Sequence, residues 1–275
     1  MAIDAQAVQD HYRQPALFDA IVAALARAGK DLAQLVADDL APVDEFHNRG
    51  RPATVELARL LDPTGGLRVL DLGCGLGGPA RHLAQAYGCR VTGLDLTPEF
   101  VAVAARLTAL TRQEDSVDFC QGDALATPFA AASFDVVWSQ NVAMNIADRA
   151  RLYAEIRRVL RPGGRYALSD VVTGTAAGDL HYPMPWARGP EASHLLSSDA
   201  TRRAIEAAGF SLVAWEDTTA SARAAAEKRE GVVPPPGSLG LQLVLGSDFP
   251  AIGANLLRNL RESRIGVVHA VALRA

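Results

Sequence analysis

The segment VLDLGCGLGG, residues 69–78, restricts the possible folds of this chain more than any other feature. Its apolar start predicts a strand, and Gly73, Gly75 and Gly78 fit the pattern G-x-G-x-x-G that links a strand to a helix. A tight turn needs only one or two glycines to supply positive φ angles, whereas this turn contains four. We therefore favour a loop whose backbone lies against a bound cofactor over a purely structural turn.

Strand-like and helical patterns alternate from residue 67 onward, which is typical of an α/β fold with a mostly parallel sheet. The patterns predict one domain over residues 63–275, with insertions at 174–196 and 218–262 that we expect to act as substrate lids. Residues 1–62 have the pattern of helices, which either cap the open end of the sheet or form a dimer interface. The expected strands cover residues 67–72, 90–95, 117–120, 134–138, 165–172, 211–215 and 265–273.

Acidic residues lie at or just after the ends of three successive strands of the expected sheet. Asp71 lies two residues before the first glycine, Asp95 ends the next strand, and Asp123 follows the third. A carboxylate at Asp71 would repel a pyrophosphate but suits S-adenosylmethionine (SAM), which carries a sulfonium and an ammonium group. Asp95 is placed to accept hydrogen bonds from ribose hydroxyls, and Asp123 from an adenine amino group. These residues favour SAM, and the alternative is a nicotinamide cofactor bound by an oxidoreductase.

Composition excludes several classes of protein. The net charge is −4 and the basic residues form no cluster, so nucleic acid is not an expected partner. There is no apolar run of about 18 residues and no basic-then-apolar start, so we expect neither a membrane span nor a secretory signal. Three cysteines without CxxC spacing favour a reducing, cytoplasmic environment. No group of residues has the spacing of a metal site.

Five segments together resemble the class I SAM-dependent methyltransferases. Within that superfamily they look most like the small-molecule group around the sarcosine/dimethylglycine N-methyltransferases and the ubiquinone/menaquinone C-methyltransferases. The resemblance implies a Rossmann-like, seven-stranded sheet with helices on both faces and an antiparallel last strand. It also implies an enzyme that transfers a methyl group to a small molecule. The segments are VLDLGCGLGGPARHLA, VTGLDLTPEF, QGDALATPF, FDVVWSQNVAMNIADR and VLRPGGRYALSDV.

The same resemblance implies which residues contact the cofactor. The glycine loop contributes backbone contacts, the end of the second strand contacts the ribose, and the loop after the third strand contacts the adenine. Tyr12 lies in an N-terminal pattern that covers the cofactor in related enzymes, and packing is the competing interpretation. The other expected cofactor contacts are Asp71, Gly73, Gly75, Asp95, Leu96, Asp123, Ala124 and Gln140.

Displacement at an activated methyl group mainly requires alignment and exclusion of water, and a base is needed only where the nucleophile arrives protonated. In the resembling N- and O-methyltransferases the segment QNVAMN usually ends in a histidine, but this chain has Asn145. An asparagine cannot take up a proton, which favours nitrogen or carbon over oxygen as the acceptor atom. The remaining catalytic candidates are Asp170, for which capping a turn is an equal alternative, and His47 in a lid-like segment.

The insertion at 174–196 contains three candidate substrate contacts, His181, Tyr182 and Trp186. Their aromatic faces can hold a cationic amine by cation–π attraction, worth about 0.5–2 kcal/mol each, or can line a planar aromatic pocket. The sequence leaves both possibilities open. A third interpretation of the chain is a SAM-binding module without transferase activity.

Overall fold

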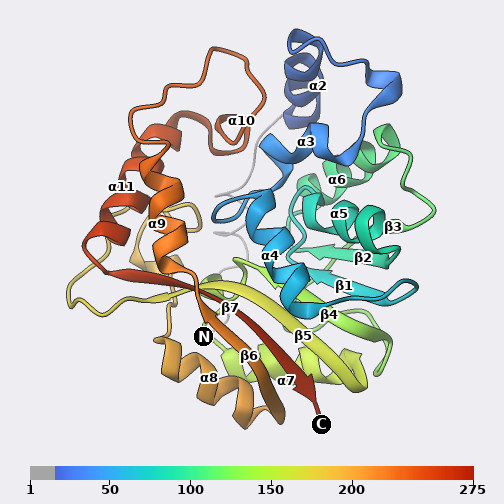
Figure 1. The fold of residues 1–275 in the computed structure, drawn as a ribbon, viewed down its shortest axis with the longest axis vertical. Helices are drawn as coiled ribbons and strands as arrows, with labels where there is room; N and C mark the ends of the chain where they lie inside the picture. The colour runs from blue at the N-terminus through green and yellow to red at the C-terminus, as the bar shows by residue number, and fades with distance from the viewer. Residues whose placement is uncertain (1–15) are drawn as a thin grey trace.

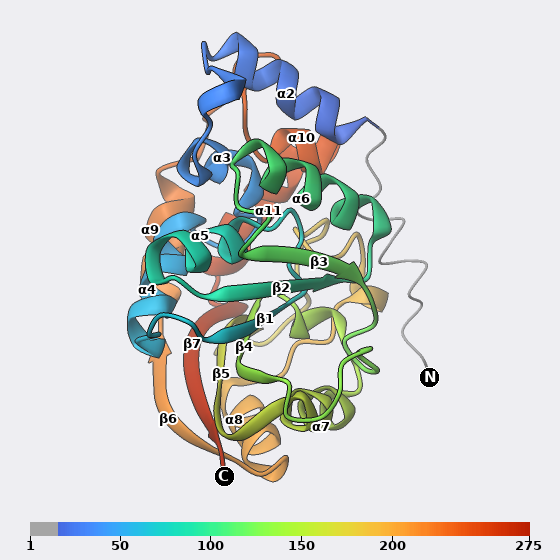
Figure 2. The ribbon, with the colours of Figure 1, turned by 90° about the vertical axis from the view of Figure 1, so that its right-hand side faces the viewer.

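Seven strands form one mixed sheet in the order β3-β2-β1-β4-β5-β7-β6 (Figures 1 and 2). The computed structural model describes residues 16–275. Neighbouring strands are parallel from β3 to β5, and β7 is antiparallel to both β5 and β6. The strands are β1 (Arg68–Leu72), β2 (Arg90–Asp95), β3 (Val117–Gln121), β4 (Phe134–Gln140), β5 (Leu160–Thr173), β6 (Phe210–Asp217) and β7 (Ile265–Arg274).

This topology confirms the predicted fold class, including the antiparallel last strand. The main difference in strand bounds is in β5, which begins at Leu160 rather than near Arg165. Leu160 pairs with Phe134 of β4 before the register shifts, and the strand pairing resumes at Arg165 opposite Val136. The segment at residues 161–164 therefore interrupts the pairing within β5 instead of preceding the strand.

Hydrophobic cores lie on both faces of the sheet. Because side chains alternate along a strand, Leu70 and Leu72 of β1 pack with α7 and α8, whereas Val69 packs with α4 and α5 on the opposite face (Figure 2). No helix within residues 16–275 has the length and apolar character that crossing a membrane requires. The helices are α2 (Leu17–Arg27), α3 (Ala37–Asp44), α4 (Arg51–Leu61), α5 (Gly78–Tyr87), α6 (Pro98–Leu110), α7 (Arg149–Val159), α8 (Ser198–Ala207), α9 (Thr219–Glu227), α10 (Gln242–Leu245) and α11 (Phe249–Arg261), with short 3-10 helices η1 (Leu32–Gln34), η2 (Ala143–Asn145), η3 (Pro190–Ala192) and η4 (Gly246–Asp248).

A helical cap, residues 17–44, packs against α5 and α6 (Figure 1). Its helices α2 and α3 share a buried hydrophobic cluster with α6 and α10, to which α2 contributes Ile21 and Leu25 and α10 contributes Val244. The guanidinium of Arg27 also donates a hydrogen bond to the carbonyl of Gly237 at 2.9 Å. Segments that are far apart in the sequence therefore meet in the cap.

Helix α4 belongs to the sheet layer, although the sequence groups it with the cap in residues 1–62. Leu57 and Leu61 of α4 lie in the same buried cluster as Val69 and Leu83. Helix α4 consequently packs on the same face of the sheet as α5.

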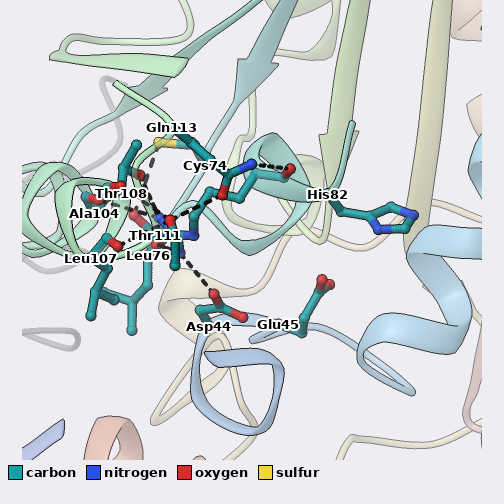
Figure 3. Close-up of polar contacts among 12 residues, drawn as sticks. Asp44, Glu45, Cys74, Leu76, His82, Ala104, Leu107, Thr108, Thr111 and Gln113 are labelled. Atoms are coloured by element: carbon teal, nitrogen blue, oxygen red, sulfur yellow. Dashed lines mark hydrogen bonds and ion pairs between the residues drawn. The ribbon is translucent and has the colours of Figure 1, made fainter. Parts of the chain in front are cut away.

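A buried ion pair connects the cap to the glycine loop. Arg81 on α5 donates to the Asp44 carboxylate at the end of α3 at 2.7 Å, and both side chains are fully buried (Figure 3). The same guanidinium donates to the Thr108 hydroxyl on α6 at 2.7 Å and to the carbonyl of Leu76 in the loop. Burial raises the pKa of Asp44 to about 6, although the charge of Arg81 opposes the shift. Three separate segments are thus fixed by one side chain.

We expect Arg81→Met to lower the free energy of unfolding by about 3–5 kcal/mol, because it leaves the Asp44 carboxyl buried without its partner. Urea denaturation measures the change. The control is Arg161→Met. The Arg161 side chain is half exposed and pairs with Asp135 at 3.0 Å, so removal of this ion pair should cost about 1 kcal/mol or less. Equal effects of the two substitutions would contradict the structural role of Arg81.

Candidate active site

A cavity of about 1470 Å³ lies at the carboxyl ends of β1, β2 and β4. The strand order reverses between β1 and β4, and ligands of open α/β sheets bind at such a switch point. The glycine loop, the cap, the segment after β4 and a C-terminal lid, residues 219–261, all line it. Most of the residues expected to contact a cofactor lie on this one wall: Asp71, Gly73, Gly75, Asp95, Leu96, Asp123, Ala124 and Gln140.

The glycine loop brings its backbone to the cavity. Gly73 and Gly75 have φ angles of 73° and 52°, in the left-handed region that favours glycine. A Cβ atom on Gly73 would lie 2.4 Å from Val142, so only glycine fits between the loop and the segment after β4. A Cβ atom on Gly75 would meet nothing within 4 Å, because that side of the loop faces the open cavity.

Asp95, at the end of β2, holds the glycine loop by a hydrogen bond. Its carboxylate accepts hydrogen bonds from the backbone N–H of Gly75 at 2.8 Å and of Thr97 at 2.9 Å. Burial raises its pKa, and these backbone N–H groups oppose the rise. Each carboxylate oxygen keeps acceptor capacity after these bonds, so Asp95 can also accept from a diol in the cavity.

Asp71 is a buried carboxyl group at the floor of the cavity with an unpartnered oxygen, Oδ2. Burial raises its pKa to about 8, and the negative charges of Glu45 and Asp95 add to the rise. At neutral pH the group is therefore largely protonated in the free protein. A positively charged ligand placed beside it would favour the ionised form and would satisfy the free oxygen.

A hydrogen-bonded network that includes His47 lies beside these acids. The Nε2 atom of His47 is 2.6 Å from the Glu45 carboxylate, which also accepts from the Thr54 hydroxyl at 2.6 Å. Burial alone would raise the pKa of Glu45, but His47 and Arg51 outweigh it and lower the pKa to about 2. The other ring nitrogen of His47, Nδ1, lies 3.4 Å from the amide nitrogen of Gln140. Glu45 is thus a carboxylate that orients the imidazole.

The sequence did not single out Glu45 or Thr54, because their role depends on contacts between α4 and the loop before it. The available signal in the sequence was the lid-like segment that contains both Glu45 and His47. Gln140 is fixed by its own neighbours as well, since its amide oxygen accepts from the indole N–H of Trp138 at 2.9 Å.

Asp170 does not line the cavity. Its carboxylate is buried beneath η2, accepts from the backbone N–H of Val171 at 3.0 Å and lies 3.9 Å from the guanidinium of Arg149. Burial raises its pKa to about 6, opposed by Arg149 and by backbone N–H groups of η2. This placement matches the capping interpretation and gives no support to a contact between Asp170 and an acceptor.

Asn145 lines the cavity, but its amide is used to hold the 174–196 insertion. The side-chain nitrogen donates to the carbonyls of Trp186 at 2.8 Å and of Ala192 at 3.0 Å. Both N–H groups are therefore committed to backbone carbonyls. The position connects the end of β4 to the insertion.

The three candidate substrate residues are separated in the structure. Trp186 reaches the cavity, although its ring is buried and its indole N–H donates to the Ser193 hydroxyl at 2.9 Å. His181 is paired with Glu262 at 2.9 Å and does not line the cavity, and Tyr182 packs against a hydrophobic cluster under the insertion. They do not form an aromatic cage, because the insertion turns only Trp186 inward. Tyr12 lies outside the described residues.

The C-terminal lid, which falls within the substrate-lid insertion predicted at 218–262, supplies a wall of the cavity. Helices α9 and α11 pack side by side, and the segment between them also lines the cavity (Figure 1). The one sequence signal was the apolar, proline-rich run at residues 232–236, which suits neither a regular helix nor a strand.

Comparison with known proteins identifies the family. Residues 70–168 match the family profile described as "Methyltransferase domain". The chain is 33% identical over 201 residues to the 27-O-demethylrifamycin SV methyltransferase of Amycolatopsis mediterranei, a match that covers 71% of this chain and 73% of that protein. The chain belongs to the class I SAM-dependent methyltransferase family.

Other relatives are matched over a smaller part of their length. The methyltransferase GfsG of Streptomyces halstedii is 36% identical over 142 residues, or 52% of this chain and 51% of that protein. Two further curated relatives are matched over 42% and 32% of their length. The solved structure of the [4+2]-cyclase SpnF superposes with a TM-score of 0.69 at 24% identity, and the match covers 100% of this chain and 97% of that one.

The cavity residues fit SAM, the cofactor of this family. Asp71 offers an unpartnered carboxyl oxygen to a cation, Asp95 offers acceptor capacity to a ribose diol, and Gly75 leaves open space where any side chain would intrude. Within residues 16–275 no cluster of three or more histidine, cysteine or acidic side chains is arranged to hold a metal ion.

Binding of the cationic cofactor should therefore release a proton from Asp71. Between about pH 5.5 and 7.5 we expect the affinity for SAM to rise by up to about tenfold per pH unit, because the raised pKa of about 8 falls in the complex. Calorimetry in two buffers of different ionisation enthalpy measures both the affinity and the proton. Asp71→Asn should abolish the pH dependence, whereas Asp123→Asn should keep it. An affinity of the unsubstituted protein that does not vary with pH would contradict the assignment.

Proposed function

We propose that this chain transfers the methyl group of SAM to a small-molecule acceptor in the cavity by in-line displacement. The observation that carries the proposal is the juxtaposition of Asp71, with its unpartnered oxygen, and Asp95, which is bonded to the glycine loop, on one wall of a cavity large enough for a second molecule. When bound, SAM supplies a methyl group on a good leaving group. The protein has to align the acceptor behind that methyl carbon and to exclude water.

In this proposal each end of the cofactor has its own contacts. Asp71 holds the positively charged methionine end, with Gln140 beside it, and Asp95 with Leu96 holds the ribose. Asp123 and Ala124 border the adenine, and the Asp123 carboxylate accepts from the backbone N–H two residues later at 2.8 Å, which fixes the loop that carries it. The cap and the C-terminal lid enclose the acceptor.

The preference for nitrogen or carbon over oxygen rests on the lack of a base at Asn145, and a base at His47 would open oxygen as a third acceptor atom. Asn145 cannot take a proton, and its N–H groups are held by the insertion. Where a proton must leave the acceptor, we assign its removal to His47. Glu45 holds the imidazole Nε2–H, so that Nδ1 carries the lone pair, and Nδ1 lies near Gln140 at the end of β4. Glu45 is a positioning residue in this scheme.

Measurements of cofactor binding and of product formation distinguish two other functions from this one. A nicotinamide-dependent oxidoreductase would bring a pyrophosphate to the glycine loop, next to the buried carboxyl of Asp71, which disfavours it. A SAM-binding protein without transferase activity would bind the cofactor and produce no S-adenosylhomocysteine (SAH). We also propose a reducing, cytoplasmic setting, supported by the three free cysteines Cys74, Cys89 and Cys120.

The first test is calorimetric titration with SAM, SAH and NAD, followed by measurement of SAH formation with a panel of acceptors. We expect micromolar binding of SAM and SAH, no binding of NAD, and acceptor-dependent SAH formation. Asp95→Ala should weaken SAM binding by about 100-fold, because it removes a charged acceptor and the bond to the loop. Asp118→Ala, on the exposed side of β3, is the control and should bind normally. Binding of NAD without SAM would overturn the proposal.

His47→Gln tests the proton transfer. We expect turnover to fall by about 100-fold or more while the affinity for SAM changes only a few-fold, because the substitution removes the base and leaves the cofactor contacts intact. Glu45→Gln should lower turnover less and should shift its dependence on pH. The control is His194→Gln, because His194 does not line the cavity. Unchanged turnover in His47→Gln would remove His47 from the mechanism.

A further inference from the structure

The part of the cavity formed by the C-terminal lid differs in chemical character from the wall that carries the carboxylates. Apolar side chains of the lid line it, and they include Val232, Leu241, Leu245, Phe249, Ile252 and Leu256. Leu245 and Phe249 are half-buried in the described chain, so part of each side chain remains accessible from the cavity.

Two valines of the lid are exposed to solvent. Val232 is 62% exposed and Val233 is 86% exposed, and both line the cavity. They are two of the four large hydrophobic residues that are exposed within residues 16–275. Apolar side chains that gather at the rim of a cavity indicate a surface that a ligand covers.

The charged residues that α11 brings to the cavity are neutralised by acidic partners. Arg258 donates to Glu262 at 2.8 Å, and Arg261 donates to Glu230 at 2.8 Å. Arg229 is exposed at the rim. The inner wall of the lid therefore offers apolar contact area, with its charges at the edge.

The aromatic residues expected to hold a cationic amine do not provide a cage. His181 and Tyr182 do not line the cavity, and the Trp186 ring is buried with Met144 and Met184. At about 1470 Å³ the cavity is larger than the roughly 300–1,000 Å³ of sites for single drug-sized ligands, so it has room for a cofactor and a sizeable second molecule.

From these observations we infer that the acceptor is a neutral, largely apolar molecule, larger than an amino acid, whose hydrocarbon part packs on the C-terminal lid. The inference rests on the proposed methyl transfer, since it names the acceptor class of that same site. The reacting nitrogen or carbon would lie toward Asn145 and His47, and the apolar part toward Leu245 and Phe249.

The test uses the full chain loaded with SAH and linear primary alcohols from butanol to decanol as probes. Calorimetry should show an affinity that increases about threefold to fourfold with each added methylene group, because each enters the apolar wall. Amines and carboxylic acids of the same chain lengths should bind at least about tenfold more weakly. A flat dependence on chain length, or a preference for the amine or for the acid at Arg229, would overturn the inference.

Substitutions locate the site. Leu245→Asn and Phe249→Asn should each weaken decanol binding by about fivefold or more and should leave SAH binding unchanged. Val213→Asn replaces an apolar side chain that is 59% exposed on β6, away from the cavity, and should change neither. A protein that fails to bind SAH contradicts the proposed function, whereas the slope with alcohol length, measured without SAH, still decides the acceptor class.

Discussion

The buried ion pair between Arg81 and Asp44 determines where the parts of the site lie relative to one another. Arg81 is on the helix that follows the glycine loop, and Asp44 ends the last helix of the cap. The next residue after Asp44 is Glu45, which orients His47, so the pair sets the distance between this imidazole and the glycine loop. The desolvation of two buried charges offsets much of their attraction, and the pair therefore contributes position more than net stability.

The acids around this pair explain why the site suits a cation. Asp71 lies near the negative charges of Glu45 and Asp95, which add to the effect of burial and hold its pKa at about 8. Glu45 is ionised because His47 and Arg51 stabilise its charge. Asp71 lacks such a partner for Oδ2 and keeps a proton instead. A bound cation can replace that proton, so the ligand supplies the positive charge that the Asp71 carboxylate lacks in the free protein.

Sequence patterns were sufficient for the sheet and for bringing Asp71, Asp95 and the glycine loop to one cavity. The carboxyl ends of parallel strands meet at one edge, so acids at the ends of β1 and β2 had to lie near the glycine loop. Patterns could not show that the Asp170 carboxylate is bonded beneath η2 and does not reach the cavity. They also could not place His181 and Tyr182, because an irregular insertion has no periodicity that shows which side chains face inward. The partnership of Glu45 with His47 depends on tertiary contacts with Thr54.

Asn145 links the cofactor half of the cavity to its apolar half. The position that usually holds a histidine in the resembling N- and O-methyltransferases here donates two hydrogen bonds to the insertion, at Trp186 and Ala192. A side chain used in this way holds the wall rigid, and we propose that His47, which also lines the cavity, removes the proton instead. An apolar wall in turn excludes water from the methyl transfer and gains affinity from the non-reacting part of the acceptor. With no charge on the acceptor to recognise, such an enzyme aligns the acceptor through the shape of its cavity, and that shape depends on the two hydrogen bonds of Asn145.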